Sequence, residues 1–232
     1  MLLRGNRTDG SMATERLFTE SDIQQLLDNN AALPFGRRNA ALIMGAVYWG
    51  LTSYELSMLS VKDVLAEDGE FLRIWVLPGH VAFNGTPREC HTEDHVLPFF
   101  EGYVEWRIAQ GAGVSNLSAY RGTSPESKFF LNNRGEPYKL SPRKSGSDEY
   151  QPRSMNEQLK RMIKKTGLHG ATPSSFRDSF VRGLYENGCG WKDLMAVTGI
   201  KQKRTLERKV RPQEAELEKV FNTLFSRVKN PF

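Results

Sequence analysis

The spacing of apolar residues along the chain predicts mainly helices. A helix start at Thr19 and Asp22 is followed by Ile23, Leu26 and Leu27 at helical spacing. Further helices are predicted over residues 37–48 (ending at Gly50), 54–59 (capped by Ser53), 99–110, 154–166 (opened by a capping box from Ser154 to Glu157) and 176–187 (closed by Gly188). Helices therefore make up most of the predicted structure.

A small sheet is predicted near the front of the chain. Residues 71–77 are aromatic and β-branched, and a second short strand is predicted at 95–98 after a loop that contains Pro and Gly. Residues 129–131 resemble a strand that enters a turn at 132–135, while 111–127 and 141–152 read as loops. The pattern therefore predicts an α+β fold that is mostly α-helical, with a small antiparallel sheet.

Both ends of the chain differ from its middle. Residues 1–15 lack periodicity and predict a flexible leader, so one domain is expected over residues 16–232. Residues 212–228 predict an amphipathic helix with a strongly apolar face, formed by Leu217, Val220, Phe221, Leu224, Phe225 and Val228. Packing on its own domain is one explanation of this face, and a second follows from the family resemblance given below.

Positive charge is concentrated in the second half of the sequence. The chain of 232 residues carries a formal charge of +5, but residues 128–211 contain 19 Lys and Arg against 8 Asp and Glu, a local balance of +11. Such asymmetry is typical of a protein with one face toward a polyanion, although a single cluster would also suit a solvated helix surface. Double-stranded DNA is therefore the predicted partner. The basic residues expected to bind it are Arg143, Lys144, Lys160, Lys164, Lys165, Lys201, Lys203, Arg204, Arg208 and Lys209, with Arg161 and Arg211 beside them.

Other classes of protein and site fit the sequence poorly. No apolar run approaches the ~18 residues of a membrane span, and polar residues come too early at the start for a signal peptide. Cys90 and Cys189 lie far apart, which favours reduced thiols. His80, His91 and His95 lie near Cys90, but the spacing fits no closed four-ligand zinc pattern. The sequence therefore predicts a cytoplasmic protein without a membrane segment, metal or cofactor.

One segment has a recognisable order of residues. It runs from Thr172 through Arg177 to Gly188 and then to Gly199. This order resembles the active-site region of the tyrosine recombinases, the phage-integrase family, which reads T-P-H-x-L-R-H-T-F, then Gly, then L-G-H, then a tyrosine. Residues 50–56, GLTSYEL, are similar to the family's G-L-R-x-x-E-L turn. The resemblance implies the family's catalytic-domain fold over nearly the whole chain, with no room for the separate N-terminal DNA-clamping domain.

Most of the family's reactive side chains are absent from the matching positions. The resemblance assigns Arg177 to the second of two arginines that bind the scissile phosphate, a role that suits a planar, permanently charged donor. Thr52 stands where the first arginine is expected. Ser174 and Ile200 stand where the family has histidines, and Asp178 replaces a third. These changes remove donors and proton-transfer groups.

Two further family groups are missing. Residues 78–95, where the hairpin lysine is expected, contain Arg88 but no Lys. The nucleophilic tyrosine is expected near Arg208 or Lys209, yet no tyrosine follows Tyr185. Arg177 either contacts a DNA phosphate or has become structural, with Asp178, Glu55 or Asp63 as its carboxylate partner.

The resemblance and the losses together imply a DNA-binding protein of this fold that does not cut DNA. Its role would be that of a regulator or accessory factor in the recombination or integration of a mobile element, or in transcription, at the bacterial nucleoid. The alternative is a divergent site-specific recombinase that cuts and rejoins DNA with residues supplied in trans. Because terminal helices of related recombinases dock on a neighbouring protomer, the apolar face of 212–228 also suits a homo-oligomer.

Overall fold

The computed structural model of the protein describes residues 16–211, and α-helices account for most of this range. The helices are α1 (Glu20–Ala31), α2 (Gly36–Val47), α3 (Ser53–Met58), α4 (Leu97–Ala109), α5 (Arg153–Lys164), α6 (Pro173–Glu186), α7 (Trp191–Thr198) and α8 (Lys203–Val210). Short 3-10 helices occupy Val61–Asp63 and Ala119–Gly122. The strands are β1 (Ile74–Leu77), β2 (Arg88–His91), β3 (Ser141–Pro142) and β4 (Tyr150–Gln151). The predicted mostly helical α+β fold is confirmed.

The first two helices show how local sequence and packing cooperate. Thr19 caps α1, and its side chain accepts from the backbone N–H of Asp22 while the Asp22 carboxylate accepts from the N–H of Thr19. Helix α2 is buried along nearly its whole length, because α1 packs on one side of it and α4 on another. This burial explains why α2 is rich in Ala, Leu, Ile and Met on all sides.

The sheet lies where it was predicted, but its second strand does not. Strands β1 and β2 pair antiparallel, with Trp75 opposite Cys90 and Leu77 opposite Arg88 on the buried side. The prediction of a strand at 95–98 was wrong, since Leu97 begins α4 and Pro98 lies in its first turn, a position that tolerates the missing N–H. The error arose because Arg88 breaks the apolar pattern of β2, although its side chain is buried.

Several other local predictions need correction. Residues 129–131 form no strand: the segment has only two isolated bridges, of Lys128 with Ser60 and of Leu131 with Pro137. All three residues are buried, so their apolar character reflects burial from several sides. The following turn is present, with Asn132 N donating to the carbonyl of Glu136. The expected loop at 141–152 contains the hairpin β3–β4. Ser154 lies inside α5, where its hydroxyl donates to the Lys139 carbonyl at 3.1 Å, so the predicted capping box is absent.

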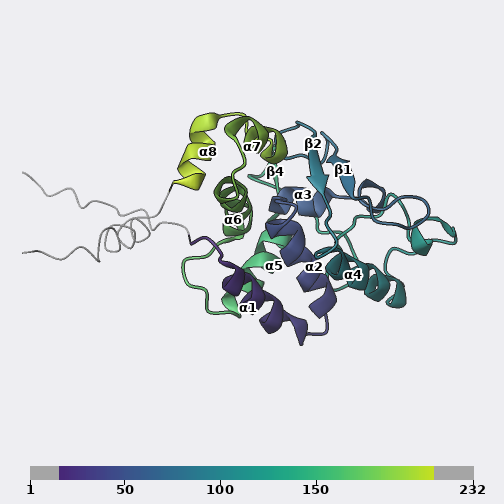
Figure 1. Ribbon diagram of the computed structural model, residues 1–232. Helices are drawn as coiled ribbons and strands as arrows, with labels where there is room; N and C mark the ends of the chain where they lie inside the picture. Colours follow the sequence, from purple (N-terminus) through teal and green to yellow (C-terminus); the bar gives the residue numbers. More distant parts are fainter. Residues whose placement is uncertain (1–15, 212–232) are drawn as a thin grey trace, which may run out of the picture.

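Two hydrophobic cores organise the described residues. The larger contains the stacked rings of Trp49 and Phe100, whose centroids lie 3.8 Å apart, and extends over α1 to α5. The smaller is formed by α6, α7 and α8, which lie together on one side of the molecule in Figure 1. Helix α6 joins the two, since Phe176 belongs to the larger core and Val181 to the smaller. Arg177, adjacent to Phe176, therefore lies at the junction between them.

Some predictions fall outside the described residues. These are the flexible leader at 1–15 and the amphipathic helix at 212–228, and the domain limits of 16–232 remain a prediction with them. Within residues 16–211, no helix is long and apolar enough to cross a membrane. In the same range, no group of three or more His, Cys, Asp or Glu side chains is arranged to hold a metal. His91 instead pairs with Glu89, and His95 packs edge-on against Tyr48.

Candidate functional site

A cleft of about 620 Å³ collects the positions that the family resemblance had marked. Thr52, Ser174, Arg177 and Ile200 all line it, although they are spread over the chain from α3 to the segment before α8. Lys209, at the place where the family's tyrosine was expected, lines the same cleft. The fold therefore brings the marked positions together even though most of their reactive groups are absent.

Thr52 has a local structural role in this cleft. It is the N-cap of α3: its hydroxyl accepts from the backbone N–H of Glu55 at 3.2 Å, and a Glu55 carboxylate oxygen accepts from the N–H of Thr52 at 2.8 Å. The cap predicted at Ser53 lies one residue too late, because Ser53 is the first helical residue. The hydroxyl at position 52 thus satisfies one backbone donor at a helix start instead of supplying a cation.

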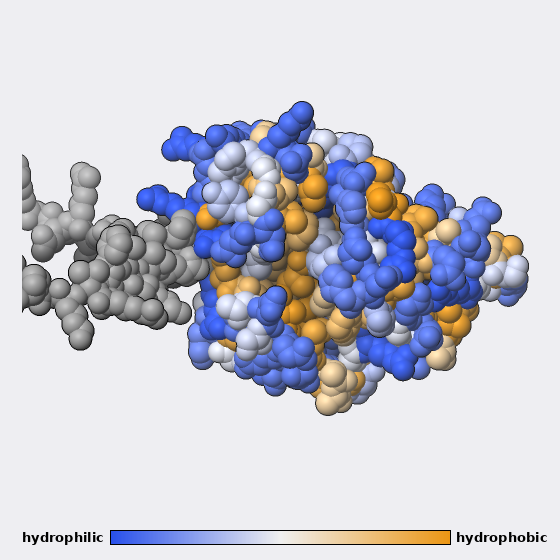
Figure 2. Space-filling model, in the orientation of Figure 1, coloured by the Kyte–Doolittle hydropathy of each residue, from blue (hydrophilic) through white to orange (hydrophobic). Residues whose placement is uncertain are grey.

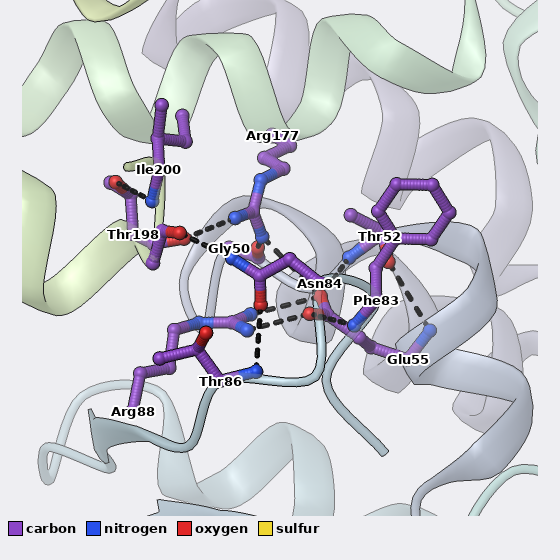
Figure 3. Close-up of polar contacts among 11 residues, drawn as sticks. Gly50, Thr52, Glu55, Phe83, Asn84, Thr86, Arg88, Arg177, Thr198 and Ile200 are labelled. Atoms are coloured by element: carbon purple, nitrogen blue, oxygen red, sulfur yellow. Dashed lines mark hydrogen bonds and ion pairs between the residues drawn. The ribbon is translucent and has the colours of Figure 1, made fainter. Parts of the chain in front are cut away.

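Glu55 is the centre of a buried ionic network (Figure 3). Arg88 from β2 donates two hydrogen bonds to its carboxylate, at 2.6 and 2.9 Å, and both side chains are only 1% exposed. Arg177 from α6 adds a third contact at 3.3 Å, and the backbone N–H of Phe83 donates at 3.1 Å. Such a paired, fully hydrogen-bonded arrangement is what allows a carboxylate to remain charged in an interior.

The network changes the protonation of its buried members. Burial by itself would raise the pKa of Glu55, but the hydrogen bonds and charge of Arg88, together with Arg177 and the Thr52 N–H, lower it to about 2. The neighbouring Cys90 thiol is removed from water, and this burial raises its pKa to about 11. Cys90 is therefore a neutral core thiol.

Arg177 faces protein acceptors from three parts of the chain. Besides Glu55, its guanidinium donates to the carbonyl oxygens of Gly50 and Thr198 (Figure 3). Its side chain is 15% exposed, and burial lowers its pKa, although an arginine remains charged in proteins. Of the three carboxylates considered from the sequence, Glu55 is the partner found, while Asp63 caps the first 3-10 helix.

The loop between β1 and β2 is tied to the other side of the cleft. The Asn84 side-chain amide donates to the Gly199 carbonyl, and its oxygen accepts from the Thr86 N–H at 3.1 Å. Gly199 ends α7 in the left-handed conformation, with φ of 68°, which favours glycine. The turn at Gly50, the loop at 83–86 and the turn at 198–200 thus form one hydrogen-bonded frame around Arg177.

The far wall of the cleft carries an ion pair at two former family positions. Lys209 of α8 donates to the carboxylate of Asp178, the residue that follows Arg177 on α6. A histidine and a nucleophile were expected at or near these places from the resemblance, and here a mutually neutralising pair occupies them. Ser174, at the start of α6, contacts the Thr172 hydroxyl at 2.9 Å.

The predicted DNA-binding residues do not all lie at this cleft. Lys160 and Lys209 line it, and Lys201, Lys203, Arg204 and Arg208 are exposed on α8 and the turn before it. Arg143 and Lys144 belong to the β3–β4 hairpin, where Arg143 pairs with Glu149 at 3.2 Å. Lys164 is exposed on α5, whereas Lys165 lines a separate hollow with Arg38. The basic residues therefore form several surfaces around the molecule.

The structural roles of two residues in the network at the cleft were not predicted from the sequence. Arg88 was noticed only because it is not a lysine, yet it is the main partner of Glu55. The sequence did contain one signal for Arg88. Glu55 is present at its family position although Thr52 replaces the arginine, so a buried carboxylate there needs a cation from elsewhere in the chain. Asn84 had no distinguishing signal, because loop asparagines are common in turns.

Comparisons with known proteins bear on this fold. No protein-family model matches the sequence, and no curated protein matches it by sequence. The structure is similar to that of XerA recombinase, with a TM-score of 0.63 and 15% identity over 93% of this chain and 66% of that chain. It is similar to the Tn1549 transposon integrase in complex with transposon right end DNA, with a TM-score of 0.58 and 15% identity over 91% of this chain and 66% of that one.

A third similar structure is that of the XerH site-specific recombinase bound to difH substrate in a pre-cleavage complex. Its TM-score is 0.58, with 16% identity over 92% of this chain and 55% of that chain. The chain thus spans from somewhat over half to about two thirds of the length of these three proteins. At this level of identity the likeness concerns the fold, which agrees with the cleft described above. The protein has the fold of the tyrosine recombinases and integrases.

Proposed function

We propose that the protein binds double-stranded DNA through this fold and does not cut it. The observation that carries the proposal is the state of the cleft: Arg177 bonds Glu55 and two carbonyls, and Lys209 pairs with Asp178. A recombinase needs a positioned nucleophile and cations that remain available to the scissile phosphate. None of the residues that line the cleft in the described part of the chain is a tyrosine.

The basic residues around the cleft support DNA as the ligand. Arg204 and Arg208 are exposed four residues apart on α8, which places them on one face of the helix. Within residues 16–211, neither forms an ion pair with a carboxylate, so both charges are available to a polyanion. A named neighbour also supports this ligand, since the Tn1549 integrase structure is a complex with transposon right end DNA.

DNA binding is expected to depend steeply on salt. Each neutralised phosphate contributes about −0.9 to the slope of log affinity against log salt, so the double variant R204Q/R208Q should flatten that slope by about 1 to 2 units. A gel-shift or fluorescence-anisotropy titration of duplex DNA at several salt concentrations measures it. The variant R37Q/K62Q removes the same charge from exposed ion pairs elsewhere and is the matched control. Equal slopes for both variants would contradict the assignment of the DNA-binding surface to α8.

The proposed absence of DNA cutting can be tested with the same protein preparation. Incubation with nicked and supercoiled substrates, followed by denaturing electrophoresis, is expected to show no covalent protein–DNA adduct. An adduct that disappears when a single tyrosine is changed to phenylalanine would instead support the alternative, a divergent recombinase completed in trans. Gel-shift activity without an adduct supports a regulator or accessory factor acting on DNA of a mobile element or a promoter, in the cytoplasm at the nucleoid.

We also propose that the protein forms a homo-oligomer through residues 212–228. A hollow of about 580 Å³ lies between α1, α2, α6 and α7, and Figure 2 shows an apolar strip on this side of the molecule. Its apolar lining includes Ile23, Val47, Tyr48, Phe180, Leu184 and Val197. The amphipathic sequence 212–228 of a second copy has an apolar face suited to such a surface.

Size-exclusion chromatography with light scattering tests this oligomer. The full chain is expected to be larger than a monomer at tens of micromolar, and the variant L224S/F225S is expected to be monomeric. L184Q alters the receiving hollow and should have the same effect, while Q24A, on the exposed side of α1, is the control. A monomeric full chain at these concentrations would contradict the oligomer and leave packing on the chain's own domain as the explanation.

A further inference from the structure

A second hollow, apart from the cleft, is lined by a buried arginine that no carboxylate among the described residues contacts. It has a volume of about 210 Å³ and lies between the end of α1, the start of α2 and α5. Arg38 lines it and is only 1% exposed. Within residues 16–211, no carboxylate forms an ion pair with Arg38, in contrast to the equally buried Arg88. The guanidinium lies over the Phe35 ring, with its carbon 4.9 Å from the ring centroid, and this contact offsets only part of the cost of burying a charge without a carboxylate.

Neutral amides are the acceptors for this guanidinium. Asn39 Oδ1 accepts from Nε at 3.2 Å and from Nη2 at 2.8 Å, and Asn133 Oδ1 accepts from Nη1 at 2.6 Å. Asn39 Oδ1 also accepts from Gln158 Nε2 at 3.2 Å. Nε and Nη2 thus both donate to one amide oxygen, at a position where a carboxylate would ordinarily accept both bonds and compensate the charge. Two of the five guanidinium hydrogens, one on each Nη, have no hydrogen bond to the described residues.

Further positive charge surrounds the same hollow. Arg161 of α5 and Lys165, the residue that follows this helix, line it, and Arg161 donates to the Gln158 amide oxygen at 3.0 Å. Helix α2 starts beside it at Gly36 without a side-chain cap, which leaves the positive end of the helix dipole uncompensated by an acidic group. The charges of Arg38 and Arg161 and the dipole thus converge on one small space that is lined by amides.

We propose that this hollow, which we call the Arg38 pocket, binds a phosphate group. A phosphate is an anion with several acceptor oxygens, which can accept from the two unbonded guanidinium hydrogens of Arg38 and from Arg161 and Lys165 in the lining. The volume is below the roughly 300–1,000 Å³ of pockets that enclose whole drug-sized ligands, so a small ion or the phosphate head of an ester fits it. The pocket is separate from the cleft around Arg177. Lys160 and Asn156 line that cleft, while Arg161 and Lys165 line the pocket.

Thermal unfolding with inorganic phosphate as the probe tests the proposal. At a hundredfold excess over Kd, binding should raise Tm saturably by roughly 5 to 10 °C relative to sodium chloride of equal ionic strength. No saturable shift with phosphate would overturn the assignment. Glycerol phosphate distinguishes the two sources, because an ester that binds as well as the free ion identifies a larger phosphorylated ligand.

Two variants locate the binding. N39D supplies an internal carboxylate to Arg38, so it should raise Tm without phosphate and abolish the phosphate-dependent shift. R161Q, at an exposed position, should weaken phosphate binding about tenfold without changing the fold. K144Q, on the distant β3–β4 hairpin, removes the same charge and should leave binding unchanged. Phosphate shifts that persist at full size in both N39D and R161Q would place the ion elsewhere and refute the Arg38 pocket.

Discussion

Replacing Arg88 by methionine is expected to lower the free energy of unfolding by about 3 to 5 kcal/mol, since it leaves a buried carboxylate without its main partner. Glu55 is 1% exposed, and Arg88 supplies two of its hydrogen bonds. Methionine fills much of the same space, so the effect measures the lost charge and hydrogen bonds more than a cavity. Urea unfolding followed by circular dichroism gives the value.

Two comparisons separate the ion pair from general effects of substitution. Arg37, in an exposed pair with Glu105 at 3.1 Å, is the matched arginine, and R37M should cost no more than about 1 kcal/mol. The double variant E55Q/R88M removes both charges and should be more stable than R88M. If R88M cost no more than R37M, the buried pair would not be a main support of the cleft.

Arg177 is expected to matter less for stability than Arg88. R177M leaves Glu55 with Arg88 but strands the carbonyls of Gly50 and Thr198, a loss of about 1 to 3 kcal/mol. A second readout distinguishes its two predicted roles. An accompanying fall in DNA affinity would support contact with a phosphate, whereas a stability loss without a binding loss would support a purely structural role.

Acid is expected to remove a similar amount of stability through Glu55. Its pKa of about 2 in the folded protein lies below the ordinary value of 4.5, so the folded state favours the ionised form. The resulting stabilisation, about 3 kcal/mol, is fully present above pH 4.5 and is lost as the pH falls toward 2, where both states become protonated. Free energies of unfolding measured between pH 2 and pH 6 test this dependence.

The variant E55Q/R88M provides the control for the acid prediction. Its loss of stability between pH 4.5 and 2 should be smaller than that of the unaltered protein, because the other carboxylates titrate in both. Most of these are exposed, for example Glu105 and Glu126, and contribute little. Superimposable pH profiles for the two proteins would contradict the assignment of the acid sensitivity to Glu55.

Short-range patterns predicted much of the fold. Thr19 with Asp22 marks a helix start that the structure confirms, because a cap bonds donors only two or three residues away. The apolar periodicity of α2 and α5 likewise depends on neighbours within two helical turns. The order of the cleft residues along the chain was sufficient to predict the recombinase fold. That order could not predict which side chains bond to one another there.

The pairing of buried polar groups was decided by the tertiary structure. Arg88 interrupts the apolar alternation of β2, so the sequence pattern predicted the second strand at 95–98 instead. In the fold, Arg88 is buried against the carboxylate of Glu55, 33 residues away along the chain. Arg38 gave no signal at all, since a basic residue in a helix is ordinarily at the surface.

The sequence by itself therefore determined helices α1 to α6, the positive second half of the chain and the identity of the side chains at the cleft. Only the tertiary structure decided that Arg177 bonds Glu55, that Lys209 neutralises Asp178 and that Arg38 is buried without a carboxylate. The physical reason is the distance along the chain over which each interaction acts. Helix propensity and capping act within a few residues, whereas the energy of a charge depends on its burial and on partners that distant segments bring to it.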